Sequence, residues 1–212
     1  MALTHKQLIL QFEEIIKTSA DERPLHEFLK KYPGILTKTF NEGAYFPTVF
    51  SKFRLAGELI PDFVMIGHRS SWSWDVNLIK IEPSNISGSL FTKHASRSNL
   101  RTAEVQVKEW QEWVKKNEQS YFVPNALKKL KEQKAWDEKP EFYGLSNENY
   151  QDILVCYRII IGQRSDFQGW GDKYQANYFK SSANRTEIVP WDRLLDTLKR
   201  WPSDLESLSN AY

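Results

Sequence analysis

Cysteine is almost absent from this sequence, which has Cys156 alone among its 212 residues. A single cysteine excludes an intramolecular disulfide and favours a reducing compartment. Long apolar runs are missing as well: the N-terminal segment is interrupted by Glu13 and Glu14, and no run approaches the roughly 18 to 20 residues of a membrane span. We therefore expect a soluble, cytoplasmic protein that does not enter a membrane.

A strong excess of one charge sign is also lacking. The formal net charge is only +2, which argues against a protein that coats DNA through a strongly basic surface. An enzyme with an acidic metal site and a basic rim would reach a similar balance. The chain has no phosphate-binding loop, dinucleotide fingerprint, serine elbow or zinc pattern. Aromatic residues are plentiful at 14%, and such rings either fill a core or stack on bases.

The apolar pattern predicts two helices, then strands, a crossover helix, further strands and a closing helix. This order predicts an α/β fold with a mixed β-sheet flanked by helices, in a single domain over 1–212. Its parts would be N-terminal helices in 1–36, a core in 45–117, and closing strands and helix in 150–200. The expected helices are 4–18, 21–32, 99–117 and 191–200, and the expected strands are 45–55, 58–67, 74–83, 153–162 and 188–190.

Charged residues interrupt the apolar faces of two successive predicted strands. Asp62 shares a strand face with Val64, and Lys80 shares the next strand's face with Glu82. Charge is unfavourable at such positions unless it has a function. Carboxylates that converge from adjacent strands form a pocket suited to Mg²⁺, and a lysine beside them can meet negative charge growing on a phosphate. Phosphodiester hydrolysis needs these parts.

A third carboxylate, Glu22, lies on the inward stripe of the second predicted helix, while Glu27 points elsewhere. His26 lies one turn along from Glu22, and we expect it to be structural. Taken alone, these short motifs are ordinary, because an edge strand with outward Lys and Glu would look the same. We also expect Trp110 and Trp113 to pack on the sheet and Cys156 to be an inert buried thiol.

A basic stretch follows the middle of the chain, where Glu118 and Glu132 are the only opposing acids. It has two interpretations, a track for nucleic acid or a solvated helix face. The lysines predicted to bind nucleic acid are Lys115, Lys116, Lys128, Lys129 and Lys131.

Several stretches carry a more specific pattern: DERPLHEFLKKYPGIL (21–36), IPDFV (60–64), LIKIEP (78–83), LFTK (90–93), AEVQVKEWQEW (103–113) and IVPWDRLLD (188–196). Together they resemble the catalytic domain of Shedu anti-phage proteins, within the PD-(D/E)XK nuclease superfamily. The resemblance extends over nearly the whole chain and leaves little room for an extra N-terminal domain. It implies a restriction-endonuclease-like fold, a metal-dependent DNA endonuclease of antiviral defence, and a homo-oligomer.

The resemblance also implies roles for individual residues. Glu22 would take the helix carboxylate position, Asp62 and Glu82 would hold Mg²⁺ or Mn²⁺, and Lys80 would stabilise charge on the phosphate. Gln106 is similar to the glutamine of a Gln-x-x-x-Tyr element beside several such sites, and would position substrate or the attacking water.

The order of the strand pair departs from the family pattern, in which an acid precedes the lysine. Here Lys80 precedes Glu82, which moves the carboxylate by roughly 7 Å along the strand, and smaller misplacements slow enzymes. Two interpretations stay open: the pocket moved with the exchange and cleaves DNA, or a nuclease fold without cleavage binds nucleic acid or a partner as a sensor. A purely structural interaction domain is the third alternative.

Overall fold

A five-stranded mixed sheet forms the centre of the computed structural model, which describes residues 4–41, 44–70, 73–86, 96–132, 152–167 and 185–201. The strands lie side by side in chain order. The antiparallel strands are β1 (Tyr45–Ser51), β2 (Phe63–Ser70) and β3 (Ser73–Ile81), and the parallel extension is β4 (Asp152–Ile160) and β5 (Thr186–Val189).

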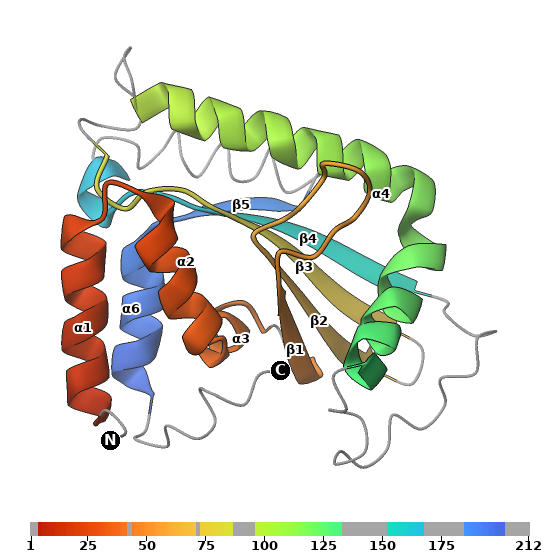
Figure 1. Cartoon of the computed structure of the whole chain (residues 1–212), viewed down its shortest axis with the longest axis horizontal. Coiled ribbons are helices and arrows are strands. Elements are labelled where there is room, and N and C mark those ends of the chain that lie inside the picture. Colours follow the sequence, from red (N-terminus) through yellow and green to blue (C-terminus); the bar gives the residue numbers. More distant parts are fainter. Residues whose placement is uncertain are drawn as a thin grey trace.

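Helices cover both faces of this sheet (Figure 1). One face carries α1 (His5–Thr18), α2 (Glu22–Lys31), α3 (Gly34–Phe40) and α6 (Trp191–Arg200), and the other carries α4 (Ser96–Glu132). A 3-10 turn, η1 (Arg164–Phe167), follows β4. The predicted α/β, restriction-endonuclease-like architecture is confirmed. Among the described residues, no helix combines the length and apolar character that crossing a membrane requires.

Alternate residues of the central strands enter two separate apolar cores. Val64 and Ile66 pack towards α4, whereas Phe63 and Met65 pack towards α1, α2, α3 and α6. Successive side chains of a strand point to opposite faces, so a strand covered on both faces is apolar almost throughout. A charge on such a strand is therefore unusual; β3 carries two buried charges, Asp75 near its start, which pairs with Arg69, and Lys80 near its end.

The sequence-based elements differ from the observed ones most at three places. α3 was not predicted, because Pro33 and Gly34 were taken as a stop; proline fits the first turn of a helix, and Ile35, Leu36 and Phe40 are buried. β2 begins at Phe63 and not at 58, since residues 56–59 form a tight turn. α4 continues to Glu132 with Pro124 inside it, fifteen residues past its predicted end at 117.

Two packing predictions had different outcomes. Trp110 is buried in the core beneath α4, and Trp113 packs against the same core, as expected. Cys156 is only half-buried, because the helices on its face of the sheet cover the other end of β4, where Arg158 and Ile160 are buried. The stretch 90–93, which contributes to the family resemblance, lies outside the described residues.

Candidate active site

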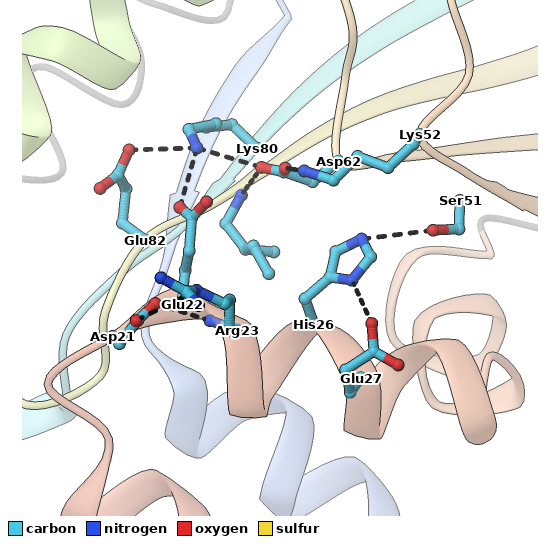
Figure 2. A network of polar contacts seen from close by, with 11 residues as sticks. Asp21, Glu22, Arg23, His26, Glu27, Ser51, Lys52, Asp62, Lys80 and Glu82 are labelled. Carbon is cyan, nitrogen blue, oxygen red and sulfur yellow. Dashed lines mark hydrogen bonds and ion pairs between the residues drawn. The ribbon is translucent and has the colours of Figure 1, made fainter.

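The candidate site lies where β2 begins, β3 ends and α2 begins. Asp62 directly precedes β2, Lys80 is the second-last residue of β3, and Glu82 follows that strand. The antiparallel register pairs Phe63 with Ile79, so Asp62 and Lys80 are the next neighbours across the two strands. Glu22 is the first residue of α2, whose N-terminus faces this end of the sheet (Figure 2).

The Lys80 ammonium is the point on which three carboxylates converge (Figure 2). Its Nζ lies 3.1 Å from Glu22 Oε2, 3.2 Å from Asp62 Oδ2 and 3.5 Å from Glu82 Oε1. Asp62, Lys80 and Glu82 are buried, and Glu22 is partly exposed. The structure therefore brings together the four charged residues that the sequence analysis selected.

Asp62 has further partners on both carboxylate oxygens. The Ile81 backbone N–H donates to its Oδ2 at 2.9 Å, and the Lys52 ammonium donates to its Oδ1. The Lys52 backbone N–H also donates to the Asp62 carbonyl at 2.9 Å. Lys52 could not be found from the sequence, because its proximity to Asp62 depends on the pairing of β1 with β2. In that pairing Ser51 lies opposite Phe63.

The backbone around Glu82 is held from three sides. Its N–H donates to the Ile160 carbonyl at 2.8 Å, and its carbonyl accepts from the Trp191 indole Nε1 at 2.9 Å. Two residues on, the Ser84 hydroxyl donates to the Ile16 carbonyl at 2.7 Å. β4, α6 and α1 thus all fix the segment that carries Glu82.

Glu22 is positioned by the cap of its own helix. The Asp21 side chain accepts from the Arg23 backbone N–H at 2.9 Å, which satisfies one of the otherwise unpaired donors of the first turn. A carboxylate in the first turn is also favoured by the helix dipole. The cap therefore determines where α2 begins and, with it, where Glu22 enters the cluster.

Burial and mutual attraction shift two pKa values in the cluster. Burial alone would lower the pKa of Lys80, but attraction to Asp62, Glu82 and Glu22 outweighs it and raises that pKa above its ordinary value. Burial raises the pKa of Glu82, and the charges of Glu22 and Asp62 add to this against the opposing effect of Lys80. The cluster therefore holds Lys80 charged and makes Glu82 harder to ionise than an ordinary carboxyl.

Whether a metal ion can bind among the three carboxylates depends on the position of the Lys80 ammonium. Within the described ranges, no group of three or more His, Cys, Asp or Glu side chains is arranged so as to hold a metal. The donor chemistry is nevertheless suitable, because Glu22, Asp62 and Glu82 each direct an oxygen towards one point, and Mg²⁺ and Mn²⁺ prefer such oxygens. The Lys80 ammonium lies at that point, so a divalent ion would bind there only if Lys80 moved aside.

The other predicted site residues are carried by α4, which covers the sheet face opposite α2. Gln106 is half-buried on α4, and in the described part of the chain no hydrogen bond or ion pair links it to the cluster. Lys115, Lys116 and Lys128 are exposed on α4, whose C-terminal end lies across the molecule from α2 (Figure 1). Lys129 and Lys131 lie in the same helix, and their side chains are outside the described part. Their roles stay predictions.

His26 has a structural environment of its own. Its ring stacks on Phe63 with centroids 4.7 Å apart, and its Nε2 lies 3.2 Å from the Ser51 hydroxyl. Its Nδ1 is 3.6 Å from a carboxylate oxygen of Glu27 (Figure 2), and the Glu27 side chain is largely exposed, as predicted. These contacts join α2 to β1 and β2.

Comparison with models of known protein families identifies a match over most of the chain. The family model described as Shedu protein SduA, C-terminal, matches residues 19–195, a span that includes all four charged residues and Lys52. No curated protein matches the chain.

Proposed function

The chain belongs to the family of the Shedu protein SduA C-terminal region, and on this basis we propose that it is a metal-dependent DNA endonuclease of cytoplasmic anti-phage defence. Family membership suggests the defence role. The observation that carries the nuclease proposal is the convergence of Glu22, Asp62 and Glu82 on one point beside Lys80. Hydrolysis of a phosphodiester requires such a combination of hard oxygen donors and a cation.

Each residue of the cluster has a task in this proposal. Asp62 and Glu82 would hold Mg²⁺ or Mn²⁺, which when bound would supply Lewis-acid charge and a water of lowered pKa. Glu22, partly exposed at the start of α2, orients the attacking water. Lys80 neutralises the buried carboxylates until an ion displaces its ammonium, and its charge then offsets, without direct contact, the negative charge that develops on the phosphate. Gln106 positions the substrate.

The first test is incubation of linear and circular duplex DNA with Mg²⁺, Mn²⁺ or EDTA, beside the Asp62→Ala variant. We expect products only with metal, and a loss of at least about 100-fold in rate in the variant, since removing one preorganised charged group costs this much in other enzymes. Thermal unfolding checks that the variant is folded. A folded Asp62→Ala protein that cuts as fast as the parent would show that Asp62 has been wrongly assigned.

A catalytically degenerate sensor is the second candidate, and the position of Lys80 favours it. The ammonium lies among the oxygens that would bind a metal, so the cluster is already neutralised in part without an ion. A sensor of this kind would bind DNA in a salt-dependent manner and yield no product with any metal. The incubation above, followed by a DNA-binding assay, separates the two candidates.

We also propose that the protein acts as a homo-oligomer, as the family resemblance implies. Light scattering on the purified chain, with and without DNA, tests this. A monomer at all concentrations and in both conditions would contradict it.

A further inference from the structure

Two lysines contact Asp62, and their surroundings differ sharply (Figure 2). The Lys80 side chain is only 10% exposed and its Nζ lies within 3.5 Å of three carboxylates. The Lys52 side chain is 51% exposed and pairs with the opposite oxygen of Asp62. A phosphate that approaches this cluster from solvent can therefore reach the Lys52 ammonium more readily than that of Lys80.

The backbone conformation of Lys52 indicates that the position of its side chain serves a function. Its φ is +50°, in the left-handed region that a lysine seldom adopts. Such conformations are strained and concentrate at ligand-binding positions. The conformation is held by the hydrogen bond from the Lys52 N–H to the Asp62 carbonyl at 2.9 Å, and it keeps the side chain directed at the Asp62 carboxylate.

The charge balance of the cluster allows the Lys52 ammonium to pair with an anion as well as with Asp62. Three carboxylates face the two ammonium groups of Lys52 and Lys80, and a bound divalent cation would further reduce the negative charge that attracts Lys52. If Asp62 held such an ion, less of its charge would be left for Lys52, and the half-exposed Lys52 ammonium would be able to pair with an external anion.

We propose that Lys52 is the side chain of this site that contacts the phosphate of bound nucleic acid. The identity of the ligand rests on the proposed function, whereas the assignment of the contact to Lys52 rests on its exposure, its backbone conformation and its pairing with Asp62. The sequence analysis gave this task to Lys80, which the structure shows surrounded by carboxylates.

The test compares Lys52→Ala and Lys52→Arg with a matched control, Lys199→Ala. Lys199 is 44% exposed and pairs with Glu13 between α6 and α1, so its removal takes away the same charge and the same kind of ion pair elsewhere on the chain. The probe is a fluorescent duplex DNA. Its affinity is measured over a range of salt in EDTA and in Ca²⁺, and its cleavage is measured with Mg²⁺ and Mn²⁺.

We expect Lys52→Ala to reduce the slope of log affinity against log salt by about 0.9, the value for one lost phosphate contact. Cleavage should fall at least about tenfold, and Lys52→Arg should retain the slope and most of the rate, because arginine also binds phosphate. Lys199→Ala should leave slope and rate unchanged. A purely structural role for Lys52 would alter thermal stability without altering the slope.

The outcomes separate this inference from the proposed function. If the parent binds DNA but never cuts it, the nuclease proposal fails, and the salt slope of Lys52→Ala alone decides the role of Lys52. If Lys52→Ala keeps the parent's slope and rate, or if Lys199→Ala reduces the slope equally, the role of Lys52 is refuted while the nuclease can stand. If the parent binds no DNA in either condition, both are refuted.

Discussion

Lys80 and Glu82 occur in the reverse of the family order, yet both side chains reach the same cluster. β3 ends at Ile81, so Glu82 lies just past the strand, while Lys80 lies beside Asp62 across the sheet. The lysine stem is long enough to bring Nζ within 3.5 Å of Glu82, although the two side chains leave the backbone roughly 7 Å apart. The exchange therefore keeps both groups in the cluster and changes which of them faces β2.

Removing the Lys80 ammonium should destabilise the protein. Lys80→Ala leaves Asp62 and Glu82 buried without their shared counter-charge, and we expect the free energy of unfolding in EDTA to fall by about 3–5 kcal/mol, measured by urea denaturation. Because the vacated oxygens suit a divalent ion, Mg²⁺ should stabilise this variant more than the parent.

The control for this experiment is Lys199→Ala, whose exposed ion pair with Glu13 should contribute no more than about 1 kcal/mol. If Lys80→Ala is as stable as this control, the ammonium does not hold the carboxylates together. If Mg²⁺ stabilises neither protein, the vacated oxygens do not form a metal site.

The raised pKa of Glu82 predicts how stability depends on pH. The folded state holds this proton more tightly than the unfolded chain, so the resulting stability is fully present below the ordinary value of 4.5 and is lost as pH rises through the higher folded pKa. In EDTA, Glu82→Gln should therefore lose less stability than the parent between pH 4.5 and neutrality. Thermal unfolding measured across that pH range tests this difference. Parallel curves of stability against pH for the parent and Glu82→Gln would contradict it.

At the scale of elements, the start of α2 links helix capping to the site. Asp21→Ala removes the side chain that caps α2, and we expect a loss of about 1 kcal/mol in the free energy of unfolding. Because Glu22 enters the cluster from the first turn, metal-dependent cleavage should also fall. Urea denaturation and the cleavage assay are the two measurements.

Thr4→Ala is a matched control for the α2 cap. Thr4 caps α1 through a reciprocal arrangement with Gln7, so its loss should cost a similar free energy of unfolding without affecting cleavage. Equal cleavage by the two variants would show that the α2 cap does not position Glu22.

At the scale of the whole molecule, a second buried charge network joins the parallel strands to the helices. Arg158 on β4 donates to Asn77 Oδ1 on β3 at 3.0 Å and pairs with Glu187 on β5. Glu187 also pairs with Arg193 on α6. The Phe40 ring of α3 lies against both guanidinium groups, so this network connects five elements on the face opposite α4.

Loss of the shared carboxylate should destabilise the whole fold. Glu187→Ala leaves the buried Arg158 without its ion pair, and we expect a decrease of about 3–5 kcal/mol in the free energy of unfolding. Cleavage per folded molecule should stay at the parent level, because Asn77 and Arg193, which the structure joins to Arg158 and Glu187, are not among the residues of the carboxylate cluster. Glu13→Ala, which removes a more exposed ion pair, is the control, and an equal effect of the two changes would contradict the prediction.

Much of the fold could be predicted because the sequence patterns that specify it lie within single helices and strands. The helix at 191–200 was predicted with its observed bounds, since its apolar positions recur at the helical period along ten residues. Asp62, Lys80 and Glu82 were selected because charges stand out on strands that are otherwise apolar. α3 escaped prediction because it is short and because its proline and glycine resemble a stop.

The sequence by itself therefore determined the class of fold, the order of its elements apart from α3, and the four charged residues, through patterns within single helices and strands together with the family resemblance. Only the tertiary structure decided that Asp62 and Lys80 are neighbours, that Lys80 lies among three carboxylates, and that Lys52 belongs to the site. These contacts depend on the register between strands, where a shift of one residue turns every side chain to the opposite face, and no local pattern encodes that register.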